Sequence, residues 1–220
     1  MLETQVATSS DDAEEKNSGR MKLTSADLEL QGDQMVGLRF TGLSILQGAT
    51  IANAYVQFQA DEVHAESTSL TIEGEDVDDA TTFSSINENI SSRPRTFASV
   101  SWSPVPWTTV GAAGSDQRTP NLATIVQEIV DRPGWSSDQS MVLIVTGSGR
   151  RVPESYNGGQ NGAPRLQVEY ATGAQLPRVR YGSLVKRAQD GSLLNPIGFC
   201  PKSRQHVVFD VMQLAMTCIS

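Results

Sequence analysis

The run "SMVLIVTGSG", residues 140–149, is the stretch that decides the fold. Five consecutive apolar residues, from Met141 to Val145, are followed by two closely spaced glycines, Gly147 and Gly149. A strand that is apolar on both faces has to be covered on both faces, because it has no polar side to turn toward water. The run therefore predicts a central strand that is packed on both sides.

The segments on either side of this run alternate apolar and polar residues, as half-buried strands do. These segments are "MKLTSADLEL" (21–30), "MVGLRFTGLSI" (35–45), "ATIANAYVQFQAD" (49–61), "SLTIEGED" (69–76) and "RLQVEY" (165–170). Short strands near Val6 and Val100 bring the expected total to about eight to ten. Many short strands joined by Gly and Asn turns are typical of a mainly β protein, a β-sandwich.

One segment has the period of a helix instead. In "TPNLATIVQEIVDRPGW", residues 119–135, apolar side chains recur at the spacing of one helical face. These side chains are Leu122, Ile125, Val126, Ile129 and Val130. Thr119 can cap the helix, Pro120 suits its first position, and "RPG" stops it. We expect one short amphipathic helix over about residues 120–132, packed on the sheets through its apolar face.

The charge of the chain is uneven. The 220 residues carry a formal charge of −8, but residues 1–170 sum to −12 and residues 171–220 to +4. An acidic body repels nucleic acid and attracts cations, so no nucleic-acid partner is expected. No run approaches the roughly 20 apolar residues that a membrane-spanning helix needs, so no membrane span is expected.

The composition changes near Tyr170, which predicts a sandwich domain over residues 1–171 and a basic C-terminal tail over 172–220. Both cysteines, Cys200 and Cys218, lie in the tail, so the body has no thiols for a disulfide or a zinc site. The tail could be an extra hairpin, an oligomerisation segment or an extension foreign to the domain. Its apolar stretch "HVVFDVMQLAMTCI" (206–219) could support self-association by adding a strand to a neighbour.

Five pieces of the sequence, in order, carry a resemblance to a known family. They are "LRFTGLSI…GATIANAYVQF", "VSWSPVPW", "TPNLATIVQEIVDRPGW", "MVLIVTGS" and "GAPRLQVEY". Over about residues 5–171 the chain resembles the DNRLRE-type carbohydrate-binding modules of bacterial extracellular proteins. The resemblance implies a jelly-roll β-sandwich with a non-catalytic role at the cell surface. It also implies acidic polysaccharides such as alginate as ligands, and structural calcium.

The residues suited to an acidic sugar gather in "SGRRVPESY", residues 148–156. A guanidinium can fork onto a uronate carboxylate while an aromatic ring stacks beside it, which makes Arg150, Arg151 and Tyr156 candidate ligand-binding residues. The alternative is that these arginines neutralise the domain's own acids. Trp102 is expected in the core, whereas Trp107 follows two prolines and could either stack on a sugar or cover the end of the sandwich.

Two acidic clusters are candidate Ca²⁺ sites, because carboxylates at strand ends can converge on a hard cation. The first follows a strand and contains Asp76, Asp78 and Asp79; the second contains Asp11, Asp12 and Glu14. Neither has the spacing of an EF-hand. The alternative for each cluster is an acidic turn exposed to solvent.

The sequence offers little for catalysis. The body has a single histidine, His64, and no Gly-x-Ser-x-Gly elbow. We therefore expect a non-catalytic binding or adhesion module, extracellular or at the cell surface, whose partner is a polysaccharide or a neighbouring surface protein. The opening residues do not read as a signal peptide. The alternative is a structural module that assembles into surface fibres or layers without a sugar ligand.

Overall fold

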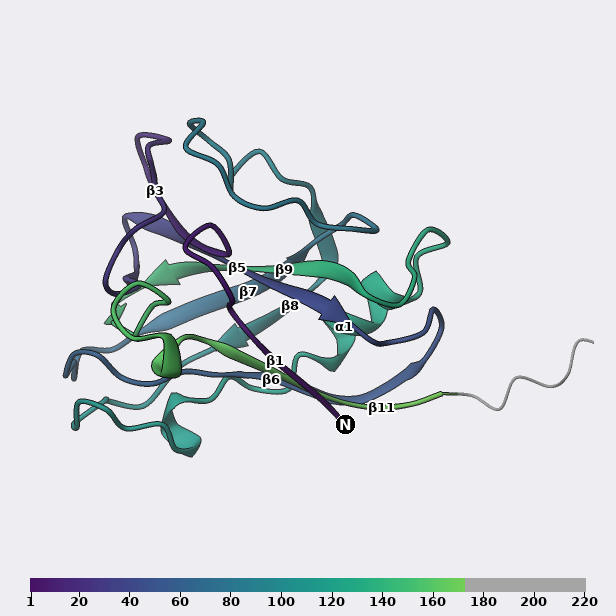
Figure 1. The fold of residues 1–220 in the computed structure, drawn as a ribbon. Helices are drawn as coiled ribbons and strands as arrows, with labels where there is room; N and C mark the ends of the chain where they lie inside the picture. The colour runs from purple at the N-terminus through teal and green to yellow at the C-terminus, as the bar shows by residue number, and fades with distance from the viewer. Residues whose placement is uncertain (173–220) are drawn as a thin grey trace, which may run out of the picture. The chain divides into compact units, whose positions relative to one another are not determined.

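The computed structural model describes residues 1–172, and these residues form antiparallel sheets with one short helix (Figure 1). The strands are β1 (Leu2–Gln5), β2 (Asp12–Lys16), β3 (Met21–Lys22), β4 (Leu30–Gln31), β5 (Gln34–Leu43), β6 (Thr50–Gln57), β7 (Ser69–Glu75), β8 (Arg95–Trp102), β9 (Gln139–Ser148), β10 (Arg150–Arg151) and β11 (Arg165–Ala171). The helix is α1 (Ala123–Val130), and two 3₁₀ turns span Ser115–Gln117 and Gln160–Gly162. The tail predicted over 172–220, including its proposed self-association, lies outside the described residues except for Thr172.

Two sheets form the body of the domain. One has six strands in the order β3-β2-β5-β9-β7-β8, and the other has three in the order β1-β11-β6. A two-stranded ribbon pairs β10 with β4. Strands far apart in the sequence are neighbours: β5 lies beside β9, and β1 pairs with β11 from Leu2 opposite Val168 to Gln5 opposite Arg165. The predicted mainly β, sandwich-like fold with one short helix is confirmed.

The central strand predicted from residues 140–149 is β9, which lies inside the six-stranded sheet. Its side chains alternate between two separate cores. Met141, Leu143 and Val145 belong to the main core between the sheets, and Val142 and Ile144 belong to a smaller core on the other face. Both faces of β9 are therefore buried, as its continuous apolar run predicts.

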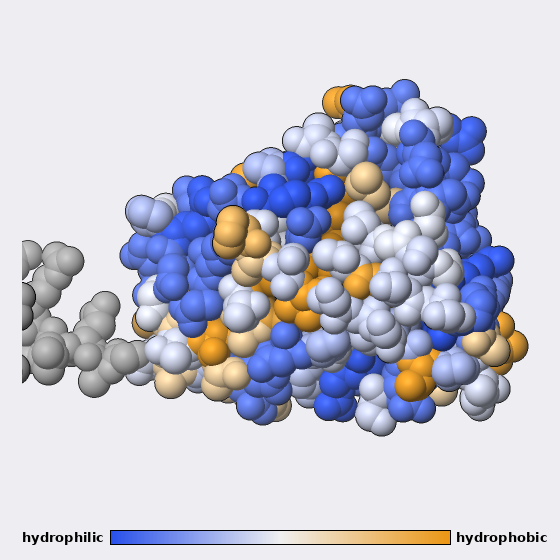
Figure 2. Space-filling view, turned by 180° about the vertical axis from the view of Figure 1, so that it is seen from behind, coloured by the Kyte–Doolittle hydropathy of each residue, from blue (hydrophilic) through white to orange (hydrophobic). Residues whose placement is uncertain are grey.

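Trp102 lies in the main core, as expected. Its ring stacks on Phe58 with 5.8 Å between ring centroids and 8° between the ring planes. The pair joins β8 of the six-stranded sheet to the residue that follows β6 of the three-stranded sheet. Trp135 is also buried, and its indole N–H donates to the Ile45 carbonyl at 2.9 Å. Seen from behind, the surface is a mosaic of hydrophilic side chains with smaller hydrophobic areas between them (Figure 2).

The helix buries the predicted apolar face but is shorter than expected. Residues 119–122 pair with β6 instead of continuing the helix: Thr119 N–H donates to the Val56 carbonyl at 3.0 Å, and Leu122 N–H donates to the Ala54 carbonyl at 2.7 Å. Thr119 Oγ1 accepts from Val56 N–H at 3.0 Å, so it does not cap the helix. The prediction of a cap at Thr119 is wrong because the neighbouring strand uses that hydroxyl.

The helix lies close to β7 at Gly74. A Cβ added at this glycine would lie 2.7 Å from Ile129 Cδ1 and 2.9 Å from Ile125 Cγ2. A side chain at Gly74 would force these packed helix side chains, or the helix itself, to move. The glycine inside "LTIEGED" is therefore required by the packing of α1.

Candidate functional site

Arg151, predicted to bind an acidic sugar, is 1% exposed. Its guanidinium donates to Thr68 Oγ1 at 2.8 Å and to the carbonyls of Glu66 and Pro104 at 3.0 Å each. A further bond goes to the Val105 carbonyl at 3.1 Å. Burial lowers the pKa of this guanidinium. Because the side chain is buried and each of its three guanidinium nitrogens donates to the chain itself, Arg151 ties two loops together and is closed to a ligand; its predicted role needs this correction.

Trp107 is also buried, at 1% exposed. Its indole N–H donates to the Asp116 carbonyl at 3.0 Å, and its backbone forms an antiparallel bridge with His64. A ring enclosed in this way cannot stack on a sugar face. Of the two alternatives for Trp107, the structure supports the one in which the ring covers the sandwich.

The other two residues of the predicted notch, Arg150 and Tyr156, also have partners within the domain. Arg150 forms ion pairs with Glu29 at 3.0 Å and Glu62 at 3.3 Å, so it neutralises the domain's own acids. Tyr156 packs against the main core, and its hydroxyl accepts a hydrogen bond from Gln160 Nε2 at 3.1 Å. The predicted cationic notch for a uronate is therefore not assembled by these residues.

The first predicted calcium cluster converges on an arginine. Asp76 and Asp78 both form ion pairs with Arg132, whose Nε lies 2.7 Å from Asp78 Oδ1. The hydrogen bond to Asp78 is the main cause of the raised pKa of Arg132. Asp79 Oδ1 accepts from Ser140 N–H at 2.8 Å. Because these carboxylates already have protein partners, the structure gives them a role in fastening the loop after β7 to the end of α1.

The second predicted cluster is buried and divided among separate partners. These are Arg39 Nη1 at 2.7 Å for Asp11, Tyr156 N–H at 2.8 Å for Asp12 and Gln34 Nε2 at 2.7 Å for Glu14. Burial raises the pKa of Asp12 to about 6, and the charges of Asp11 and Glu14 add to the rise. These acids therefore hold β2 to its neighbours. They are buried, so the alternative prediction of an acidic turn exposed to solvent is wrong for this cluster.

A different set of acids has the geometry of a metal site. Oxygens of Asp27, Asp61 and Glu62 lie within 4.8 Å of one another and could hold an ion. Burial raises the pKa of Asp61, and the charges of Asp27 and Glu62 raise it further. Glu154 pairs with Asp27 in an isolated bridge, and its pKa is raised by burial and then by Asp61. No sequence spacing signals this group, because its members come from segments that only the fold brings together.

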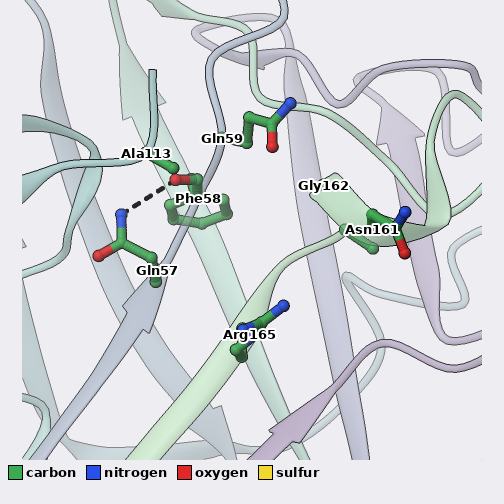
Figure 3. A pocket seen from close by; sticks show the side chains of 8 residues that line it. Gln57, Phe58, Gln59, Ala113, Asn161, Gly162 and Arg165 are labelled. Atoms are coloured by element: carbon green, nitrogen blue, oxygen red, sulfur yellow. Dashed lines mark hydrogen bonds between the residues drawn. The ribbon is translucent and has the colours of Figure 1, made fainter. Parts of the chain in front are cut away.

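A pocket of about 180 Å³ lies where β6 ends and β11 begins (Figure 3). Its lining consists of Gln57, Phe58, Gln59, Ala113, Asn161, Gly162, Ala163 and Arg165. Three carboxamides and one guanidinium thus meet beside apolar surface. Each carboxamide can donate and accept hydrogen bonds at once. A small polar ligand with hydroxyl groups matches this chemistry.

Paired strands hold two of these side chains in place. Gln57 and Arg165 lie directly opposite each other in the register of β6 and β11. Gln57 Nε2 donates to the Gly114 carbonyl at 3.0 Å, and Gln57 Oε1 accepts from Arg118 Nε at 3.1 Å. Arg165 forms an ion pair with Glu3 at 3.0 Å. These contacts fix one wall of the pocket.

Two other residues that line the pocket carry amides without protein partners. Within residues 1–172, the side-chain amides of Gln59 and Asn161 form no hydrogen bond to the chain. The loop comes close to Gln59 at Gly162, where an added Cβ would lie 3.1 Å from Gln59 Cδ and 2.7 Å from Glu154 Cγ. Glycine is required there by this close approach. The unpaired amides of Gln59 and Asn161 are the groups available to a ligand.

An ordered polar surface continues from the pocket over the outer face of the three-stranded sheet. The Arg118 guanidinium lies 4.3 Å above the centre of the Tyr55 ring. The Tyr55 hydroxyl bonds to Gln167 Oε1, and Gln167 Nε2 donates to Glu3 Oε2 at 2.7 Å. Alternation in "AYVQFQAD" and "RLQVEY" places Tyr55, Gln57 and Gln167 on polar faces, but the sequence does not reveal that the two strands pair.

Comparison with known proteins assigns no family to the domain. No protein-family model and no curated protein sequence matches the chain. Within residues 1–172, no helix has the length and apolar character needed to cross a membrane. The resemblance to DNRLRE-type modules stays a prediction from the sequence.

Proposed function

We propose that the domain is a non-catalytic glycan-binding module of an extracellular or surface protein, with its ligand at the pocket between Gln59 and Asn161. The observation that carries the proposal is the pair of side-chain amides that face this pocket without a protein partner. An amide offers a donor and an acceptor, and a sugar hydroxyl can satisfy both. Polar groups converging on a concave surface are the usual mark of a small-ligand site.

The surroundings of the pocket favour a chain-like ligand. Gln57 and Arg165 stand on hydrogen-bonded strands, which position side chains more accurately than loops do. The Tyr55 ring, partly exposed and covered on one side by Arg118, lies on the same face of the sheet. A sugar chain running from the pocket over this face would meet amide, guanidinium and aromatic groups in succession.

Structural calcium forms part of the proposal, at Asp27, Asp61 and Glu62. Glu62 Oε2 also pairs with Arg150 at 3.3 Å and with His64 at 2.9 Å, so Asp27 and Asp61 are the two acids of this group that no cation within residues 1–172 already holds. Ca²⁺ prefers carboxylate oxygens, and an ion would relieve the repulsion from Asp27 and Glu62 that adds to the effect of burial in raising the pKa of Asp61. Glu154, bridged to Asp27, touches the loop at Gly162. An ion here would stabilise the loop that carries Asn161.

The test is a calorimetric titration of the full chain with a panel of neutral and acidic oligosaccharides. Replacement of one hydrogen-bonding amide, in Gln59→Ala or Asn161→Ala, should weaken binding roughly two- to tenfold. Asn87→Ala is the matched control, because Asn87 is exposed on another loop. Unchanged affinity in both pocket variants would show that the ligand binds elsewhere. Failure of every oligosaccharide in the panel to bind would contradict the proposed function.

One observation favours the second candidate function, a structural module that assembles with other copies. Phe97 is 100% exposed on β8, which forms an edge of the six-stranded sheet. The Glu128 carboxylate accepts hydrogen bonds from Phe97 N–H and Ala98 N–H, both at 2.7 Å, and thereby covers part of that edge. Sedimentation over a wide concentration range decides: assembly that Phe97→Ser abolishes supports this candidate, and a monomer at every concentration excludes it.

A further inference from the structure

Resting on the proposed function, we infer that the pocket selects a neutral glycan and discriminates against a uronate chain. The residues that line the pocket include a single cation, Arg165. Its Nη1 lies 3.0 Å from Glu3 Oε1. Glu3 thus already neutralises this guanidinium, and a ligand carboxylate that bound its remaining N–H groups would lie beside a second negative charge.

The next cation on this face is also engaged. Arg118 lies over the Tyr55 ring at 4.3 Å and donates through Nε to Gln57 at 3.1 Å. A fork onto a ligand carboxylate needs two parallel N–H groups of one guanidinium. Nε of Arg118 is held by Gln57, and Arg118 is not among the residues that line the pocket, so the fork left on its two terminal nitrogens is not presented to a ligand there.

The electrostatic field behind the pocket also disfavours an anion. Glu154 contacts the pocket loop at Gly162 and belongs to the group of acids that includes Asp27 and Asp61. Residues 1–170 as a whole carry a net charge of −12. A carboxylate entering the pocket would therefore approach a surface of its own sign.

The free groups of the pocket fit hydroxyls better than carboxylates. Gln59 and Asn161 each leave both a carbonyl oxygen and an NH₂ group unpaired. A hydroxyl can donate to the first and accept from the second, whereas an ionised carboxylate only accepts. A carboxylate would leave the amide oxygens without a donor and repel them.

The experiment compares pairs of oligosaccharides with the same sugar configuration, linkage and length that differ only at C6, as CH₂OH or as carboxylate. Calorimetric titration of the full chain should give at least about fivefold tighter binding of the neutral member in the pair that binds best. Glu3→Gln should raise the affinity for the uronate by about two- to fivefold and leave the neutral affinity unchanged.

The outcomes separate this inference from the function on which it rests. Equal or tighter binding of the uronate would overturn the neutral preference and leave glycan binding intact. The absence of binding by every pair would overturn both. If Glu3→Gln leaves the preference for the neutral glycan unchanged, Glu3 is not its cause, and the electrostatic explanation is overturned.

Discussion

Two polar regions of this domain differ in what their side chains are free to do. The segment from Arg150 to Tyr156 has the most conspicuous charges in the sequence, yet Arg151 is fully buried and Arg150 pairs with the domain's own acids. The pocket is lined by amide side chains that no sequence motif distinguishes. The amides of Gln59 and Asn161 have no hydrogen-bond partner within the described residues. A polar side chain can bind a ligand only if the fold has not already used its hydrogen bonds.

The largest expected effect is a loss of stability, and it tests whether Arg151 is a structural residue while Arg165 is not. Arg151→Ala should destabilise the domain by about 3 kcal/mol or more, because it removes a buried side chain and takes the donor away from the Pro104 and Val105 carbonyls. The melting temperature should fall by on the order of 10 °C. Arg165→Ala, at a partly exposed position, should cost less than about 1 kcal/mol. Equal and small losses in thermal melts would contradict the difference drawn between these two arginines.

Calcium binding tests the same difference on the acids, because only carboxylates without a cationic partner are free to bind the ion. At 100 times its dissociation constant, an ion bound only by the native state adds about 2.7 kcal/mol to stability. Asp27→Asn with Asp61→Asn should abolish the rise in melting temperature that Ca²⁺ produces relative to a chelator. Asp76→Asn with Asp78→Asn should leave that rise in place, because Arg132 already holds these acids. Identical melting of the unaltered chain in Ca²⁺ and in chelator would rule out the ion.

The buried acid Asp12 gives a pH-dependent effect of about 3 kcal/mol. Its folded pKa, about 6, lies above the ordinary value of 3.8, so the folded state binds more protons than the unfolded state between these values. Stability therefore falls as pH rises through this window, and the cost of the buried charge is fully present above pH 6. Asp12→Asn should be more stable than the unaltered domain at pH 7.5. The gain is reduced by the weaker hydrogen bond that a neutral amide oxygen accepts from Tyr156 N–H.

The measurement for Asp12 is chemical denaturation at several pH values. The stability difference between the variant and the unaltered domain should shrink toward pH 4, where the carboxyl is protonated in the folded state and about half protonated in the unfolded state. A difference that does not vary between pH 4 and pH 7.5 would mean that Asp12 titrates normally.

How much of the fold the sequence predicts depends on how local the signal is. The apolar run of β9 implies burial of both faces because each side chain there needs cover, whatever strands supply it. The helical face of α1 is also a local pattern. The helix start was missed because residues 119–122 exchange hydrogen bonds with β6, more than 60 positions earlier.

The candidate site was predictable only in part. Alternation already places Gln57 and Gln59 on a polar face of their strand, but the register that sets Gln57 opposite Arg165 comes from the fold. The acids Asp27 and Asp61 are 34 positions apart in the chain and meet because Asp27 forms a bridge with Glu154 while Ala60 forms one with Pro153. Burial of Trp107 likewise depends on its backbone bridge to His64.

The most direct test of the central claim is a nitrogen–proton NMR titration of the labelled chain with the glycan that binds best. The side-chain NH₂ signals of Gln59 and Asn161 should shift with ligand concentration, since these amides are free to bind. The indole N–H signal of Trp107 and the Nε–H signal of Arg151 should stay in place, because the chain already holds both groups. Shifts at Trp107 and Arg151, with the two amide signals unmoved, would contradict this assignment of the site.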